Sequence, residues 1–259
     1  MIAIDELSFS SKLALVHPKE KLVFSMLPLV LCIGLDSILV SVVTIVVMAA
    51  ATIRQNHALK KRYLHFMLIP AGFLLLGTLT VLVNQHPVTD KLLLGITIGS
   101  HAYGIDGQSL YRGGKLILRA MGAVSCMYFL SFNTPMTSLF QVLRHTKLPS
   151  VLVSLMELIY RYIFVIWEEA DRMRIAQHSR LGNCDFKTSL VSTGMLASTL
   201  FIRAYQRCDR VYAALESRGY ENDLDSLTDD YTPCGRFYGY TAVLCVILLA
   251  LGIAEKLWL

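Results

Sequence analysis

Residues 22–51 read LVFSMLPLVLCIGLDSILVSVVTIVVMAAA, an apolar run of 30 residues in which Asp36 is the one charged side chain. A transmembrane helix needs about 20 apolar residues, so this run is too long for one span and short for two. Gly34, Asp36 and Ser37 interrupt its middle. We therefore expect a tight hairpin of two short helices.

Basic residues flank this hairpin on both sides, namely Lys12, Lys19, Lys21, Arg54 and the three residues 60–62. Cytoplasmic segments of membrane proteins carry an excess of Lys and Arg. Two crossings place both flanks in the cytoplasm, whereas one crossing would separate them. The N-terminus is therefore expected inside.

The composition of the 259-residue chain agrees with a membrane location. Hydrophobic residues make up 54%, the mean hydropathy is +0.53, and 17% of residues are charged, against about 25% in soluble domains. Apolar stretches at 64–83, 116–132 and 237–253 add three spans. The glycine-rich stretch 84–114 is expected outside, with a short apolar piece, LLLGITIG, at the membrane interface. The chain is thus predicted to be an all-α membrane protein with about five transmembrane helices.

Residues 133–236 differ from the rest, because they hold 12 of the 24 Lys and Arg and 12 of the 19 Asp and Glu. Helix starts are predicted at Thr134-Pro135, Pro149-Ser150 and Asp185, and helix ends at Gly182-Asn183 and Gly219. The two later helices are each about 32 residues long, or about 48 Å. We divide the chain into a transmembrane region (1–132, about four spans), a cytoplasmic or interfacial helical region (133–236) and a C-terminal transmembrane helix (237–259).

Both long helices end in one decapeptide pattern: DRMRIAQHSR at 171–180 and DRVYAALESR at 209–218. At 100° per residue, the five identical positions lie within one half of the helix surface. Four of the five differing positions lie on the other half. The sequence therefore repeats one helix face and leaves the back free to differ.

Small residues on that face allow close approach of another protein, and a terminal arginine can bind carboxylates or carbonyls in a bidentate manner. Arginines near helix ends are also common because they favour the helix dipole. Two copies in register indicate two equivalent sockets, which paired ATPase subunits provide. Gly113-Gly114-Lys115 lacks the phosphate-loop spacing, so a partner would have to hydrolyse ATP.

These residues resemble the transmembrane T component of energy-coupling factor (ECF) transporters, and most closely its CbiQ cobalt-transport branch. The helix ends AQHSRLG (176–182) and ALESRGY (214–220) are similar to the paired signatures of T components, although Leu181 is inserted before Gly182 in the first. The segments VHPKEKL (16–22), NTPMTSLFQVLRHTKLP (133–149) and YRYIFV (160–165) add to the resemblance, which covers nearly the whole chain.

The resemblance implies an L-shaped scaffold with coupling helices and no catalysis of its own. Its partners would be two ABC-type ATPase subunits similar to CbiO, a substrate-binding membrane subunit similar to CbiM and a small subunit similar to CbiN, in the lipid bilayer. ATP and Mg²⁺ would belong to the ATPases, and this chain would hold no cofactor. The substrate would be a transition-metal ion, cobalt or nickel. A T component for a vitamin-type substrate and a stand-alone transporter remain alternatives.

Residues for two contacts follow from this resemblance and from the helix pattern. The ATPase-coupling residues, carried over by position, are Ala176, Ser179, Arg180, Ala214, Ser217 and Arg218. The apolar first halves of the long helices offer adaptable side chains to the substrate-binding subunit, and the residues predicted for this contact are Leu155, Met156, Met195 and Leu196.

Other functions find less support in the sequence. The seven histidines show no HxxxH spacing and the six cysteines no CxxC spacing, so we expect no metal site. Asp36 and Arg119 are the only Asp, Glu, Lys or Arg residues within the predicted spans, and no buried acid–base pair indicates an enzyme. The repeat lies outside the spans, unlike the inverted repeats of secondary transporters. No basic and aromatic stripe indicates nucleic acid.

Overall fold

The computed structural model describes residues 8–9, 11, 13, 16–55, 60–82, 84–86, 94–98, 101–105, 107–220, 231 and 235–258. The chain divides into two compact units. The first, here the bundle unit, comprises residues 2–139 and 230–259, and the second, the hairpin unit, comprises residues 140–229. The division into three regions that we made from the sequence, at 1–132, 133–236 and 237–259, stays a prediction.

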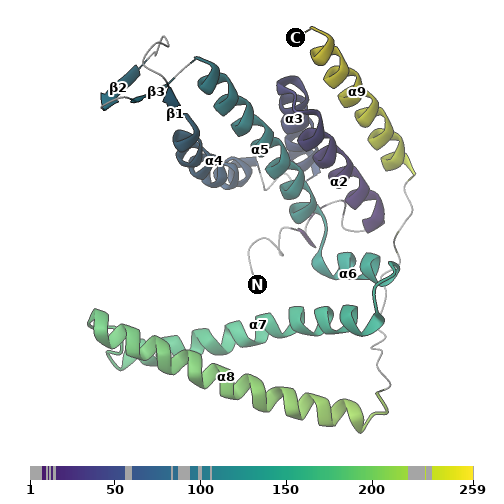
Figure 1. Cartoon of the computed structure of the whole chain (residues 1–259). Coiled ribbons are helices and arrows are strands. Elements are labelled where there is room, and N and C mark those ends of the chain that lie inside the picture. Colours follow the sequence, from purple (N-terminus) through teal and green to yellow (C-terminus); the bar gives the residue numbers. More distant parts are fainter. Residues whose placement is uncertain are drawn as a thin grey trace. The chain divides into compact units, whose positions relative to one another are not determined.

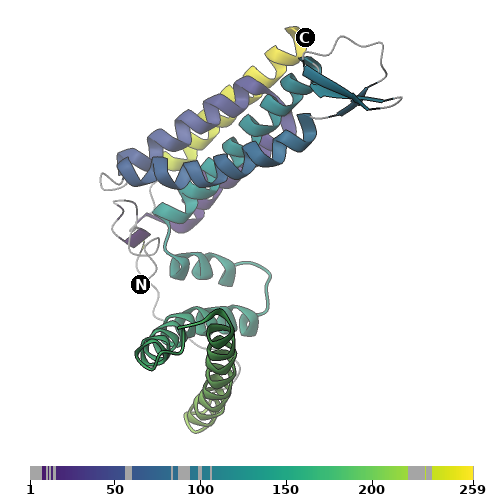
Figure 2. The ribbon, with the colours of Figure 1, turned by 90° about the vertical axis from the view of Figure 1, so that its left-hand side faces the viewer.

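Five helices of the bundle unit correspond to the five predicted spans: α2 (Pro18–Leu35), α3 (Ile38–Gln55), α4 (Lys60–Leu82), α5 (Gly107–Asn133) and α9 (Arg236–Trp258). They lie side by side in Figures 1 and 2. α5 packs against α2, α3 and α4, while α9 packs against α2 and α3. The predicted all-α membrane class is confirmed by these helices.

The predicted hairpin turn lies between α2 and α3. Asp36 there has a left-handed backbone with φ of +47°, a conformation that Asp tolerates better than most residues. Ser41 donates its backbone N–H to Ser37 O over 3.2 Å as α3 begins. The interruption at residues 34–37 thus forms the turn that it predicts.

Four of the described helices are long and apolar enough to cross a membrane by length and composition: α3, residues 109–133 of α5, residues 237–256 of α9, and α7 (Ser150–Ser179). In α4 the apolar stretch is shorter, Tyr63–Leu79. α2 has Lys19, Glu20 and Lys21 in its first turn. α7 belongs to this group because it contains an apolar window of 18 residues, which agrees with our assignment of its first half as apolar.

A small antiparallel sheet lies between α4 and α5 in the sequence, within the glycine-rich stretch that we expected outside the membrane with a short interfacial piece. Its strands are β1 (Asn84–His86), β2 (Leu94–Ile98) and β3 (His101–Ile105), in the order β1-β3-β2. Asn84 pairs with Gly104, and Leu94 pairs with Ile105. Strands of three to five residues are too short for a clear alternating pattern, which explains why the sequence analysis missed them.

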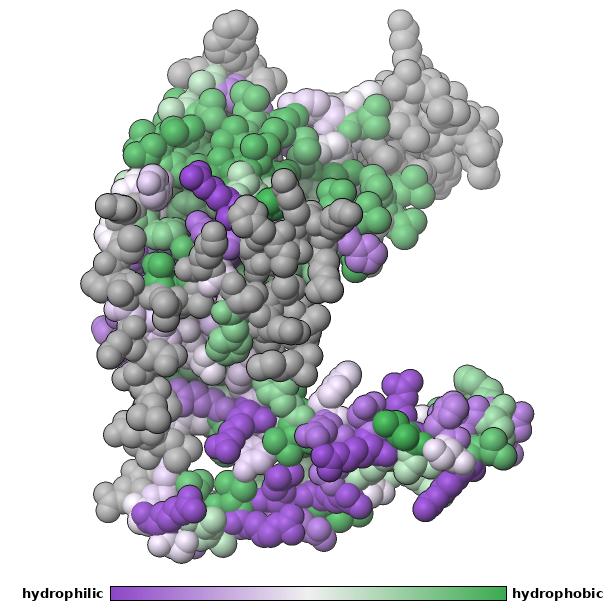
Figure 3. Space-filling view, turned by 180° about the vertical axis from the view of Figure 1, so that it is seen from behind, coloured by the Kyte–Doolittle hydropathy of each residue, from purple (hydrophilic) through white to green (hydrophobic). Residues whose placement is uncertain are grey.

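The outer surface of the bundle unit is apolar, as a lipid-facing surface should be. On α4, Leu64, Leu68, Phe73 and Leu76 are all exposed. In Figure 3 this unit shows mostly hydrophobic residues, whereas the helices of the hairpin unit show mostly hydrophilic ones. A membrane therefore surrounds the first unit's helices, and the multi-pass location predicted from the sequence is confirmed.

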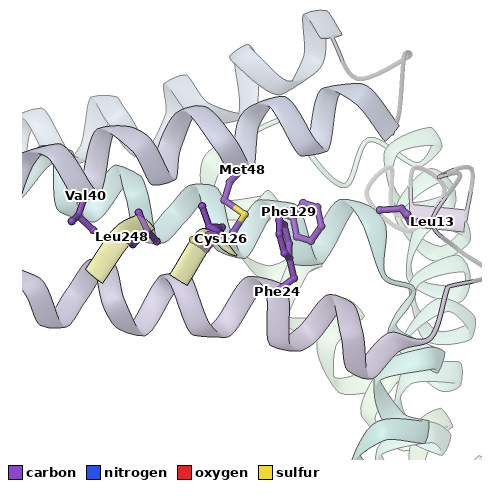
Figure 4. Close-up of a cluster of buried hydrophobic side chains, with 8 residues drawn as sticks. Leu13, Phe24, Val40, Met48, Cys126, Phe129 and Leu248 are labelled. Atoms are coloured by element: carbon purple, nitrogen blue, oxygen red, sulfur yellow. The ribbon is translucent and has the colours of Figure 1, made fainter. Parts of the chain in front are cut away.

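The interior of the bundle is formed by small clusters contributed by several helices. Phe24, Val40, Met48, Phe129 and Leu248 belong to the largest cluster (Figure 4). The rings of Phe24 and Phe129 lie 5.1 Å apart between centroids. Gly122 lets α5 approach α2 closely, since a Cβ there would come within 2.7 Å of Cys32 Sγ. This packing holds α2, α3, α5 and α9 together as one scaffold.

Candidate docking site on two helix ends

The hairpin unit contains the two predicted long helices, α7 and α8 (Phe186–Glu216), preceded by the short α6 (Met136–Arg144). Their predicted starts and ends agree with the structure within three residues. Gln177 Nε2 donates to Ser192 O over 2.9 Å, and Glu169 pairs with Arg203 at 2.6 Å. These contacts make α7 and α8 antiparallel, so their C-terminal ends lie at opposite ends of the hairpin (Figure 1).

The end of α7 is closed by two hydrogen bonds of a Schellman turn. Gly182 N–H donates to Gln177 O over 2.9 Å, and Leu181 N–H donates to His178 O over 3.1 Å. Leu181 has φ of +58°. In this motif the residue just after the helix adopts the left-handed conformation, which glycine usually provides. Arg180 directly precedes that residue.

The end of α8 has the same turn. Tyr220 N–H donates to Leu215 O over 3.1 Å, Gly219 N–H donates to Glu216 O over 3.0 Å, and Gly219 has φ of +73°. Every partner lies 38 residues after its counterpart in the first turn, the same offset as the repeated decapeptide. The repeat in sequence is therefore also a repeat in backbone geometry, with Arg180 and Arg218 at equivalent places.

This equivalence changes our interpretation of Leu181, which we had taken as an insertion before Gly182. The hydrogen bonds show that Leu181 replaces the glycine, because it holds the position of Gly219. Gly182 is needed for another reason. A Cβ there would come within 2.9 Å of both Gln177 O and Ser192 Oγ, so the turn lies too close to α8 for a larger residue.

The five identical positions of each decapeptide are exposed to solvent, and these are Asp171, Arg172, Ala176, Ser179, Arg180, Asp209, Arg210, Ala214, Ser217 and Arg218. The half-buried positions belong to the differing set: Met173 and Gln177 in α7, and Val211 and Leu215 in α8. The variable back thus faces the hairpin, while the repeated face is accessible to a partner.

The polar groups of the repeated face leave the arginines available. Ser179 Oγ donates to Ile175 O and Ser217 Oγ donates to Ala214 O, each over 3.0 Å, so both hydroxyls are bonded to their own helix. Within the described part of the chain, neither Arg180 nor Arg218 forms an ion pair. Each guanidinium can therefore offer its five N–H donors to a partner protein.

The four residues predicted for the substrate-binding subunit do not form one patch. Leu155 and Met195 are exposed, while Met156 and Leu196 are half-buried. The Arg207 guanidinium lies 5.6 Å from the ring centre of Tyr162. Leu155 lies seven residues before Tyr162 in α7, and Met195 lies twelve residues before Arg207 in α8. Because the two helices are antiparallel, these offsets point in opposite directions and separate Leu155 from Met195 by about 28 Å along the hairpin.

Leu155 instead belongs to an apolar groove between α7 and α8 that the sequence analysis did not predict. The groove has a volume of about 290 Å³, and its lining includes Leu155, Ile159 and Ile163 from α7 and Ala204, Cys208 and Val211 from α8. Because α8 contributes its second half here, the surface combines opposite halves of the two helices. No sequence signal identifies this pairing before the antiparallel register is known.

Three charged side chains of the bundle unit form ion pairs at the α2–α3 turn. Asp36 pairs with Lys115 and Arg119, each at 3.1 Å, and the carboxylate is more than half exposed. Asp36 and Arg119, which the sequence analysis had considered separately, therefore pair with each other. Together with Lys115 they hold the α2–α3 turn against α5. Among the described residues, no group of three His, Cys, Asp or Glu side chains is placed to hold a metal ion.

Lys21, which we had assigned to the basic flank, is fully buried. Its Nζ donates to Leu13 O over 2.9 Å and to Asn133 O over 3.1 Å. Ser11 Oγ donates to Asn133 Oδ1 over 2.9 Å. The lysine thus fastens the N-terminal segment to the end of α5, a role that the sequence did not predict.

Five helices of the bundle unit, together with two long helices that end in matched exposed arginines, define a multi-pass membrane protein with two equivalent helix ends. Residues 9–228 match the model of the family described as CbiQ, cobalt transport protein. The chain belongs to this family. It is 27% identical to the cobalt transport protein CbiQ of Salmonella typhimurium, with 86% of this chain and 99% of the relative covered.

Two further relatives extend this comparison. A putative fused cobalt transport protein CbiMQ of Methanocorpusculum labreanum is 31% identical over 84% of this chain and 36% of the relative. The energy-coupling factor transporter transmembrane protein EcfT of Staphylococcus aureus is 28% identical over 48% of this chain and 50% of the relative. The predicted resemblance to the CbiQ branch of ECF transporter T components is confirmed, and the chain is a membrane component of a cobalt-type ECF transporter.

Proposed function

We propose that this chain couples ATP hydrolysis in two ABC-type ATPase subunits to a separate substrate-binding membrane subunit of an importer for a transition-metal ion, cobalt or nickel. The observation that carries the proposal is the matched pair of helix ends. Arg180 and Arg218 precede the same turn at the same offset and lie on exposed faces of the same composition. Two helix ends with the same geometry suit equivalent binding sites on two ATPase subunits.

In this proposal Ala176, Ser179 and Arg180 form one docking end, and Ala214, Ser217 and Arg218 form the other. The small side chains allow the helix end to enter a groove, and the guanidinium bonds carboxylates or carbonyls of the socket. ATP and Mg²⁺ are held by the ATPases, and this chain supplies no catalytic group.

The substrate-binding subunit is proposed to be a CbiM-like protein, accompanied by a small CbiN-like subunit. The name of the Methanocorpusculum labreanum relative joins CbiM to CbiQ in one chain, which supports this partner. On this chain we assign its contact to apolar side chains of α7 and α8, with exposed Leu155 and half-buried Met156 at one end of the hairpin, and exposed Met195 and half-buried Leu196 toward the other.

Uptake of labelled cobalt and nickel, together with co-purification of the ATPases, tests the proposal in Arg180→Ala, Arg218→Ala and the double variant. A charged hydrogen bond contributes about 1.5–3 kcal/mol, so each single variant should weaken ATPase binding about tenfold, and the double variant should abolish uptake. Arg174→Ala is the matched control, because this exposed arginine lies in the first decapeptide where the second has Tyr212. Normal uptake by the double variant would contradict the proposal.

A further inference from the structure

A second groove lies in the bundle unit, between α3 and α9, away from the docking ends. Its volume is about 1140 Å³. Leu13, Phe24 and Phe129 line it together with residues of the two helices, and these are Val47, Ala50, Ala51, Arg54 and Gln55 of α3 and Phe237, Gly239, Tyr240, Val243, Leu244 and Ile247 of α9. Tyr240, Val243 and Ile247 are exposed, so the groove opens outward from the bundle.

The groove begins at one end of the bundle and extends toward its middle. Arg54 and Gln55 end α3, while Phe237 and Tyr240 belong to the first turns of α9. From Arg54 to Val47 the helix rises about 10 Å, and from Phe237 to Ile247 about 15 Å. This is the end that carries the basic flanks, so the mouth lies at the predicted cytoplasmic surface of the membrane.

Arg54 is the charged residue of this lining. Its side chain is exposed, and among the residues that the structure describes no acidic side chain pairs with it. A guanidinium with no acidic partner among the described residues, next to an apolar groove, matches the two parts of a phospholipid. A phosphate accepts two parallel hydrogen bonds from arginine, and an acyl chain fills apolar walls inside the hydrocarbon layer. Tyr240 is exposed in the first turns of α9, at the membrane depth where tyrosine side chains contact lipid headgroups.

We propose that this groove binds one anionic phospholipid of the cytoplasmic leaflet, with its phosphate on Arg54 and one acyl chain between α3 and α9. Arg54 then supplies the charge complementarity, since that leaflet is rich in anionic lipids. The lipid closes the space between the two helices near the start of α9. A transmembrane helix of a partner could also contact Ala50 and Gly239, and the experiment below separates this occupant from a lipid.

Native mass spectrometry of the full chain, purified in mild detergent and titrated with phosphatidylglycerol or phosphatidylcholine, tests the proposal. The wild type should retain one phosphatidylglycerol in preference to phosphatidylcholine. Arg54→Gln should weaken phosphatidylglycerol binding about tenfold, as expected for loss of a charged hydrogen bond. Ala50→Trp should block the groove. Its matched control is Val46→Trp, one turn away on the same face of α3, exposed and outside the lining.

Arg112→Gln controls for charge, because Arg112 is an exposed arginine near the opposite end of the bundle, in the first turns of α5. Equal retention of the two lipids, or equal losses in Arg54→Gln and Arg112→Gln, would overturn the proposal in favour of general surface lipid. If Ala50→Trp loses a co-purifying membrane subunit while phosphatidylglycerol binding persists, the groove holds a partner helix instead. Should Ala50→Trp fail to fold, the comparison of Arg54→Gln with Arg112→Gln decides the question.

Discussion

Leu181 and Gly219 hold the same left-handed position, 38 residues apart, in the turns that end α7 and α8, with φ of +58° and +73°. A glycine adopts this conformation freely, whereas other L-residues do so at a cost of about 1–2 kcal/mol. The side chain of Leu181 is 73% exposed, so packing does not offset this cost. The first docking end therefore retains backbone strain that the second lacks.

This difference predicts opposite effects of substitution at the two positions. Leu181→Gly should stabilise the purified protein by about 0.5–1 kcal/mol, because relief of strain exceeds the added chain entropy of glycine. Gly219→Ala should destabilise it by about 1 kcal/mol. Thermal unfolding midpoints would measure both. A lower midpoint for Leu181→Gly would show that Leu181 makes a stabilising contact.

A second stability prediction concerns Glu255, which connects α9 to the start of α3. Its carboxylate accepts hydrogen bonds from Ser37 Oγ and from the backbone N–H groups of Ile38 and Leu39. Helix N-terminal N–H groups lack partners within the helix, so Glu255→Ala should cost about 1–2 kcal/mol. Lys256→Ala, at the neighbouring exposed position, should leave the unfolding midpoint unchanged. Equal midpoints for the two variants would show that the cap is dispensable.

The sequence predicted the helices well because apolar runs and capping residues are local signals. The α2–α3 turn follows from the residues at 34–37, and the ends of α7 and α8 follow from Gly182 and Gly219. The helix-face argument also agrees with the structure, because the identical residues are exposed and Met173 and Gln177 on the back are half-buried.

Relationships between distant segments could not be predicted in the same way. Lys21 is indistinguishable in sequence from other flanking lysines, and its burial depends on carbonyls at Leu13 and Asn133. The separation of Leu155 from Met195 follows from the antiparallel register, which Glu169 and Arg203 help to set. Helical periodicity carries no information on either of these long-range contacts.

The topology predicted from the basic flanks can be tested by cysteine labelling in whole cells. Gln55→Cys lies at the predicted cytoplasmic end of α3, and Gly107→Cys lies at the predicted outer end of α5, where a Cβ meets open space. A membrane-impermeant thiol reagent should label the second and spare the first. The wild-type chain controls for its native cysteines. Labelling of Gln55→Cys from outside would reverse the orientation.

The separation of the two apolar contact sites leads to a prediction on the substrate-binding subunit. Leu155→Gln and Met195→Gln should each reduce co-purification of that subunit and leave the ATPases bound, because neither residue belongs to a docking end. Since the sites are about 28 Å apart, their free-energy effects should add in the double variant. Loss of the ATPases in either variant would contradict the assignment.

Charge reversal at a docking end should be more harmful than truncation. Arg218→Ala removes the guanidinium, whereas Arg218→Glu also sets a negative charge against a socket expected to offer acceptor oxygens. Arg218→Lys keeps the charge but loses the bidentate geometry, so its effect should be intermediate.

ATPase co-purification and ion uptake should therefore rank wild type above Lys, Lys above Ala, and Ala above Glu, with about tenfold weaker binding for Ala. All variants should retain the substrate-binding subunit, since the residues assigned to that contact on α7 and α8 are unchanged. Equal binding by the Ala and Glu variants would show that the socket does not recognise the charge of Arg218, and the same ranking at Arg180 would show that the two ends act alike.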